Sequence, residues 1–220
     1  MFKSAEAFGL PELMKRDQDG NVIGFSEFPH LETERLMLRR MTMDDAEFYL
    51  RHMSEPSIVS METFEAPENM NAAIEALREY CVDIFTKDQG IRWGIELKGT
   101  PELIGTCGFY KWVKHAHHAE IGYDLDPEHR RKGIMTEALT AMLEYMFTAV
   151  ELNRVQALVD PGNQPSIKLI TKLGFSKEGV LRSYSYFRGK YLDDVVFSLL
   201  RREWKQPMSR ADCRSTDNSS

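Results

Sequence analysis

The chain has 220 residues, 42% of them hydrophobic, and carries a formal net charge of -6. This length suits one domain with a substantial core, and no uncharged apolar run is long enough to span a bilayer. The mildly acidic balance argues against nucleic acid as a partner and is compatible with cationic ligands. Because the first residues also lack the basic start and apolar centre of a secretory signal, we expect a cytoplasmic protein without a membrane partner.

Composition divides the chain into three parts. We expect an N-terminal extension over residues 1–30, a folded body over residues 31–204 and a polar, disordered tail over residues 205–220. Within the extension, turn-forming residues 17–21 precede the short apolar run 22–25, which predicts a turn followed by a strand. Cysteines are far apart and form neither a disulfide framework nor a metal-binding pair. Cys81 and Cys107 are expected to fill the core, and Cys213 lies in the tail.

The first half of the body is predicted to contain a strand, two helices and three further strands. Residues 35–40 alternate polar and apolar side chains, which predicts a strand. Thr42 then caps a helix that extends to Met53 and ends before Pro56, and residues 68–86 form a second helix with one apolar face. Residues 91–97, 103–112 and 119–125 form strands joined by short turns, so these strands must be antiparallel.

The second half of the body alternates helices and strands. A polar loop over residues 126–133 leads into a helix that extends to residue 149. Residues 155–159 form a strand, residues 165–173 a helix that Gly174 ends, and residues 180–187 and 191–200 a final hairpin. Hairpins mixed with strand–helix–strand crossovers predict an α/β fold of the mixed α+β kind. Its twisted central sheet of about six to seven strands has helices on both faces.

The loop over residues 126–133 is the most informative segment. It is basic, contains Gly133 and leads from a strand directly into a long helix. The first N–H groups of a helix have no internal partner and the helix dipole makes that end positive, which suits a phosphate-bearing ligand. Gly133 allows a tight turn and removes a side chain where phosphate oxygens would approach. The alternative is a solvated basic loop with a glycine for geometry. The segment lacks the GxxxxGK[ST] pattern of a Walker A loop and the GxGxxG pattern of a Rossmann fingerprint, so neither of these sites is expected.

Three segments of the body carry motifs that occur together in one family. Residues 130–135 read Arg-Arg-Lys-Gly-Ile-Met, and residues 163–166, 172–175 and 178–179 read N-x-x-S, K-x-G-F and E-G. They resemble the [QR]-x-x-G-x-[GA] cofactor motif and the second signature of the GNAT acetyltransferases, except that Met135 replaces a small residue. Residues 31–39 resemble the start of the ribosomal-protein N-terminal (RimJ/RimL-like) branch. The resemblance spans residues 31–204 and implies the GNAT fold.

The resemblance implies acetyl-CoA as co-substrate, no metal, and direct transfer of the acetyl group to a primary amine. Two neighbouring strands of such a fold splay apart and hold the pantetheine arm, so the backbone of Tyr123 and Leu125 is expected to contact it. The N–H groups of residues 131–136 are expected to hold the pyrophosphate, with added positive charge from the basic residues. Further cofactor contacts are thus assigned to Arg130, Arg131, Lys132, Gly133, Ile134, Met135, Thr136, Asn163 and Ser166.

Three residues are candidates for acid–base catalysis, because acetyl transfer needs a deprotonated amine and a proton for the leaving thiolate. Glu120 lies where some members of the family place the glutamate that deprotonates the amine through water. Its alternative role is an outward-facing strand carboxylate or a partner for His118 or an arginine. Ser166 is the candidate for protonating the thiolate, although both it and Asn163 also suit a helix N-terminus. Tyr186 could protonate the thiolate instead, but aromatic residues on strands often serve packing.

Several acceptors are compatible with the resemblance. A protein N-terminal α-amine is the leading acceptor, and a small amine such as a polyamine or an antibiotic is the alternative. A non-catalytic module that senses CoA is a third hypothesis. The first two helices of the body and its last hairpin are expected to shape the acceptor pocket. Members of the family occur as monomers and as homodimers, so both states stay open.

Overall fold

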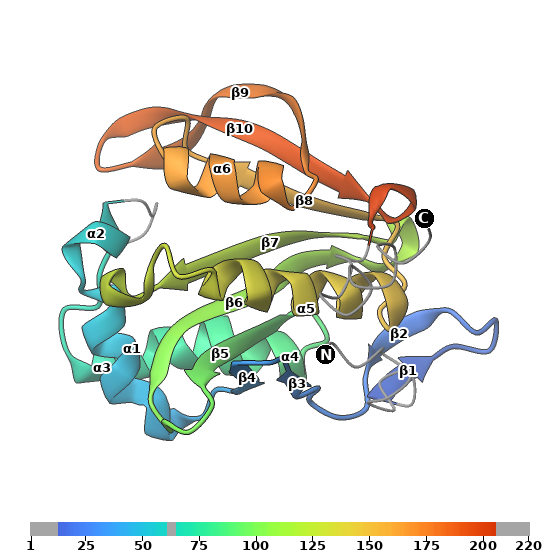
Figure 1. Ribbon diagram of the computed structural model, residues 1–220, viewed down its shortest axis with the longest axis horizontal. Helices are drawn as coiled ribbons and strands as arrows, with labels where there is room; N and C mark the ends of the chain where they lie inside the picture. The colour runs from blue at the N-terminus through green and yellow to red at the C-terminus, as the bar shows by residue number, and fades with distance from the viewer. Residues whose placement is uncertain (1–12, 61–64, 206–220) are drawn as a thin grey trace, which may run out of the picture.

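The computed structural model describes residues 13–60 and 65–205 (Figure 1). In this part of the chain an eight-stranded mixed sheet has the strand order β3-β4-β5-β6-β7-β8-β10-β9. The predicted mixed α/β fold is confirmed. The sheet has one strand more than expected, because β3 is too short to produce an alternation pattern. The strands are β3 (Leu31–Glu32), β4 (Leu36–Arg40), β5 (Ile91–Leu97), β6 (Leu103–Val113), β7 (His118–Leu125), β8 (Arg154–Val159), β9 (Ser176–Phe187) and β10 (Lys190–Leu200).

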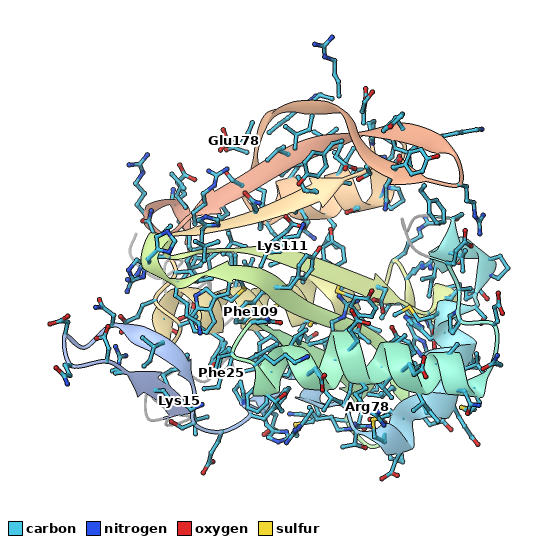
Figure 2. All side chains as sticks on the ribbon, turned by 180° about the vertical axis from the view of Figure 1, so that it is seen from behind. Lys15, Phe25, Arg78, Phe109, Lys111 and Glu178 are labelled. Carbon is cyan, nitrogen blue, oxygen red and sulfur yellow. The ribbon has the colours of Figure 1, made fainter. Side chains whose placement is uncertain are left out.

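Helices cover both faces of the sheet, as predicted. Helices α5 (Ile134–Thr148) and α6 (Gln164–Lys172) lie on one face (Figure 1). The opposite face carries α3 (Met70–Leu77) and α4 (Ile84–Thr86), seen in Figure 2. Helix α1 (Ala46–Met53) packs against α3, and the short α2 (Pro56–Val59) follows it.

Two predicted elements differ in detail from the structure. The expected single helix over residues 68–86 contains a π-helical turn at Arg78–Asp83 between α3 and α4. A pattern of 3.6-residue periodicity does not signal such a turn. Strand β9 begins at Ser176 rather than at residue 180, and its pairing with β10 shifts register twice. These irregularities interrupt the alternation of side chains on which strand prediction depends.

Part of the N-terminal extension packs against the body. Strands β1 (Met14–Arg16) and β2 (Val22–Phe25) form an antiparallel hairpin around the predicted turn. The Phe25 ring stacks on Phe85 at a centroid distance of 5.3 Å and lies 5.2 Å from the Trp112 ring. Residues 13–30 therefore contribute to the main apolar core. The expected disordered tail lies outside the described residues, except for Lys205.

Burial removes two of the cysteines from chemistry at neutral pH. Cys81 and Cys107 are core residues, as predicted, and burial raises the pKa of both thiols to about 12. Cys213 lies outside the described residues. No helix within residues 13–60 and 65–205 is long and apolar enough to cross a membrane.

Candidate active site

The sheet splits in its middle, between β7 and β8. These parallel strands pair only from His118 opposite Arg154 to Glu120 opposite Gln156. Beyond that point β7 stays paired with β6 as far as Leu125, while β8 stays paired with β10. Figure 1 shows the two strands diverging. Unpaired strand edges therefore face each other beyond Glu120, which is the arrangement that the sequence resemblance implied for a pantetheine arm.

The N-terminus of α5 opens beside this split. Gly133 precedes the helix with φ +78°, and the first intrahelical bond at this end joins the Glu137 N–H to the Gly133 carbonyl at 3.0 Å. Among the residues that the structure describes, no side chain caps this helix. The earlier N–H groups are therefore left for water or a ligand, and the helix dipole favours an anion there.

The predicted phosphate-loop residues divide into core and surface side chains. Ile134 and Met135 are buried in the main core, so the larger residue at position 135 points its side chain away from the loop surface. Arg131 and Lys132 are exposed, and Arg131 adopts φ +61°. The Arg130 Nε donates to the Leu125 carbonyl at 2.9 Å. One lone pair of the Leu125 carbonyl is thus used within the protein, and Arg131 and Lys132 present their charge to solvent.

An N-terminal segment holds this loop in place. The Glu137 carboxylate, in the first turn of α5, accepts from the Thr33 hydroxyl at 2.5 Å and from the Arg35 Nε at 2.6 Å. Arg35 also donates to the Lys132 carbonyl at 3.0 Å. The Arg35 guanidinium is thereby held next to the N-terminus of α5. The sequence motif at residues 31–39 contained these residues, but only the fold shows that they bind a residue about a hundred positions later.

Glu120 is the last residue of β7 that pairs with β8. Its side chain is almost fully buried, and its two oxygens accept from Lys111 Nζ at 3.0 Å and from Gln156 Nε2 at 3.2 Å. The expected alternative partners, His118 and an arginine, do not bind it in the part of the chain that the structure describes. A buried carboxylate at the point where the sheet opens is well placed to accept a proton from an amine.

Tyr123 and Ser166 meet on the opposite face of β7 from Glu120. The Tyr123 hydroxyl lies 2.6 Å from the Ser166 Oγ, which joins β7 to α6 across the split. Asn163 caps α6, because its Oδ1 accepts from the Ser166 N–H at 3.1 Å. Burial raises the pKa of Tyr123 to about 12, although the bond to Ser166 lowers it in part. The phenol is therefore a proton donor at neutral pH. From the sequence only the backbone of Tyr123 was expected to contact the cofactor, and the pairing of its hydroxyl with Ser166 was not predicted.

Tyr186 lies elsewhere in the sheet. It is 62% exposed, and its ring lies 4.9 Å from that of Tyr191, its partner on β10. The described contacts do not bring Tyr186 to Tyr123 or Ser166, because β9 is separated from β8 by β10. The tip of the β9–β10 hairpin instead reaches the segment between α2 and α3, where Arg188 forms two hydrogen bonds with the Glu65 carboxylate, at 2.8 and 3.1 Å. The hairpin was expected to shape the acceptor pocket together with the first two helices of the body, and Glu65 lies in the connection between α2 and α3.

A buried network of charged side chains lies where β7 leads into the loop before α5, and it was not predicted from the sequence. His52 of α1 binds the Asp124 carboxylate through Nε2 at 2.5 Å and the Asp126 carboxylate through Nδ1. Asp124 also accepts from Arg92 and from the Thr106 hydroxyl. Burial opposes charge on both partners, yet the two carboxylates raise the pKa of His52 to about 9, and Arg92 and His52 lower the pKa of Asp124 to about 2. The network ties α1 to the strand end from which the loop departs.

This network predicts that the free energy of unfolding falls as the pH rises from about 6.5 to about 9. The folded protein holds the His52 proton more tightly than the unfolded chain, where imidazole titrates near 6.5. The stabilisation that this proton gives the folded protein is therefore complete below pH 6.5 and is lost as the pH rises through the His52 pKa of about 9. The change is on the order of 3 kcal/mol. Urea unfolding at a series of pH values measures it. His52→Gln should flatten the profile, and equal slopes for both proteins would contradict the assignment.

The split strand pair and the open, glycine-preceded helix N-terminus define an N-acetyltransferase fold. The chain belongs to the family of the acetyltransferase (GNAT) domain, whose model matches residues 35–176. Members of this family use acetyl-CoA as the acetyl donor, so this chain is an acetyl-CoA-dependent N-acetyltransferase.

Individual relatives support the RimJ/RimL-like branch. The uncharacterized N-acetyltransferase YoaA of Bacillus subtilis (strain 168) is 40% identical over 174 residues, which cover 79% of this chain and 98% of that protein. The [ribosomal protein uS5]-alanine N-acetyltransferase of Escherichia coli (strain K12) is 30% identical over 182 residues, covering 79% and 92%. The structure of Mycobacterium smegmatis RimJ in complex with CoA-disulfide superposes with a TM-score of 0.67 at 26% identity, covering 80% and 86%.

Proposed function

We propose that the chain transfers the acetyl group of acetyl-CoA directly to a primary amine, with the α-amine of a protein N-terminus as the leading acceptor. The observation that carries this proposal is the buried Glu120 carboxylate at the opening of the β7–β8 split. The Escherichia coli relative, an alanine N-acetyltransferase of a ribosomal protein, supports an N-terminal acceptor. Direct transfer is supported by Cys81 and Cys107, whose burial keeps both thiols protonated.

The proposed cofactor contacts follow from the unpaired backbone groups and the basic side chains of the site. The N–H groups of residues 131–136 bind the pyrophosphate, and Arg130, Arg131 and Lys132 add positive charge. The unpaired edge of β7 between Tyr123 and Leu125 binds the pantetheine arm. Asn163 and Ser166 lie at the start of α6 on the other side of the split. In this proposal the charged end of the cofactor lies at the α5 N-terminus and its thioester lies toward Glu120.

The chemistry then uses the two faces of β7. Glu120 takes a proton from the acceptor ammonium, directly or through water, and the free amine attacks the thioester carbonyl carbon. The C–N bond forms, the C–S bond breaks and the electron pair leaves on sulfur. Tyr123 donates a proton to the thiolate, and Ser166 positions its hydroxyl at 2.6 Å. The acetylated nitrogen releases its second proton to solvent, and the Tyr123 phenol regains one proton from solvent. Tyr123 replaces Tyr186 as the aromatic acid in this proposal, because the Tyr186 ring packs against that of Tyr191 in the edge hairpin, away from the split.

Glu120→Gln is expected to lower turnover by about 10²–10⁴-fold, the usual contribution of a general base. The amide keeps the size of the side chain but cannot accept the proton, so binding of acetyl-CoA should persist. CoA release is measured over a panel of N-terminal peptides, polyamines and amino sugars, with cofactor binding followed separately. Glu151→Gln is the matched control. Glu151 is also salt-bridged, to Arg16 of β1 at 2.7 Å, but it lies between α5 and β8, at the opposite end of α5 from the cofactor loop.

The outcomes of this panel separate the three hypotheses. Turnover confined to N-terminal peptides supports the proposal, and turnover confined to polyamines or amino sugars assigns a small-amine acceptor instead. Acetyl-CoA binding without turnover on any amine would indicate a sensor module. Full activity of Glu120→Gln would overturn the assignment of the base.

A further inference from the structure

A lysine of the protein itself forms an ion pair with Glu120, the proposed base. Lys111 lies on β6, and its Nζ is 3.0 Å from the Glu120 Oε1. Tyr110, the preceding residue, pairs directly with Glu120, so in a regular strand the Lys111 side chain would point to the opposite face. The structure avoids this because Lys111 adopts φ +50° and the β6–β7 register shifts between Tyr110 and Val113. The bulge aims the lysine at the Glu120 carboxylate.

This ion pair differs from the other lysine–carboxylate pairs of residues 13–60 and 65–205. The Glu120 side chain is 5% exposed, whereas the carboxylates of the other three pairs are between 23% and 46% exposed. Those three pairs are surface contacts of small energetic value. The Lys111 side chain is itself 59% exposed and lies over the middle of the sheet (Figure 2), where it pairs with the buried Glu120 carboxylate. The other three pairs are Lys15–Asp88, Lys87–Asp83 and Lys98–Glu32.

A primary amine is thus held on the carboxylate that the proposed function assigns to deprotonate the acceptor. Glu120 is also the last paired residue before β7 and β8 diverge. With acetyl-CoA bound in the β7–β8 split as proposed, the lysine, the base and the acetyl donor belong to one complex. Acetyl transfer to Lys111 is then an intramolecular step, in which the effective concentration of the amine is raised strongly. We propose that Lys111 is an acetylation site of the protein, modified at Nζ by its own active centre. This inference rests on the proposed function.

The reaction balances without any further reactant. The Lys111 ammonium gives one proton to Glu120, and the neutral Nζ attacks the thioester carbonyl carbon. The C–N bond forms, the C–S bond breaks and its electron pair leaves on sulfur. The nitrogen then loses its second proton while the thiolate gains one, so the products are Nζ-acetyl-lysine, CoA thiol and one proton on Glu120. Acetylation removes the positive charge of Lys111 and with it the ion pair to Glu120.

The test is peptide mass spectrometry of the full chain after incubation with acetyl-CoA. Lys111 should be acetylated at least about tenfold faster than Lys87, the reference surface lysine, as expected for a positioned nucleophile. The rate constant should not change when the protein concentration is varied, because the reaction occurs within one chain. Glu120→Gln should slow modification of Lys111 and leave Lys87 unchanged. Lys111→Arg should remove the site while keeping a cation beside Glu120.

Each other outcome has a definite meaning. Equal rates at Lys111 and Lys87, or a rate constant that grows with protein concentration, would overturn the inference. If the protein binds acetyl-CoA and acetylates external amines while Lys111 stays unmodified, only the inference fails. If acetyl-CoA neither binds nor supports turnover on any amine, the proposed function fails as well. Thermal stabilisation by acetyl-CoA, measured on the same sample, separates these last two cases.

Discussion

Replacing Gly133 by aspartate is expected to abolish stabilisation of the protein by acetyl-CoA. Wild-type protein should gain about 2.7 kcal/mol at a hundredfold excess of ligand over its dissociation constant. A side chain at position 133 would enter open space, with only the Arg35 Nη2 nearby, at 3.5 Å from the new Cβ. The carboxylate would therefore lie at the helix N-terminus and repel the pyrophosphate. Thermal unfolding with and without acetyl-CoA measures the loss.

Two further variants separate ligand binding from backbone strain. Gly20 also has a left-handed φ, +85°, with open space around it, but lies in the remote β1–β2 turn. Gly20→Asp should therefore show similar local strain and an unchanged response to acetyl-CoA. Gly133→Asn adds bulk without charge and should retain more of the response than Gly133→Asp. A full thermal shift in Gly133→Asp would remove the α5 N-terminus from the cofactor site.

Asp124→Ala is expected to lower the free energy of unfolding by about 3–5 kcal/mol. The substitution leaves the cations of Arg92 and His52 in a largely buried site without their shared carboxylate, and breaking such a network is strongly destabilising. Urea unfolding at neutral pH measures the change. Asp83→Ala is the matched control, because Asp83 forms a surface ion pair with Lys87 and its loss should stay within about 1 kcal/mol.

The double variant with His52→Gln tests whether the network acts as a unit. Residues in contact have non-additive effects, so the combined loss should be smaller than the sum of the single losses by at least about 0.5 kcal/mol. Strict additivity would mean that Asp124 stabilises the protein through Arg92 and Thr106 alone. A loss below about 1 kcal/mol in Asp124→Ala would show that the folded protein accommodates the unpaired cations.

The sequence by itself determined the order of the main elements and predicted an anion site at the start of α5. Periodicity along the chain is a local property, so the strands near residues 91–125 and the helix after Gly133 could be predicted from neighbouring residues alone. The basic loop before α5 likewise allowed the prediction of an anion site, because the glycine, the charges and the helix start are contiguous. The same locality explains the missed features, since a π turn and the register shifts of β9 depend on packing.

Only the tertiary structure decided which side chains meet. His52 and Asp124 are 72 positions apart, and Tyr123 and Ser166 are 43 positions apart. Nothing in the local pattern of either partner specifies the other, because such contacts depend on how α1, α6 and the sheet pack. The direction of Lys111 depends likewise on a bulge that alternation cannot foresee. Proximity along the chain specifies elements and motifs, whereas the pairing of charges in a low-dielectric interior is specified by the fold.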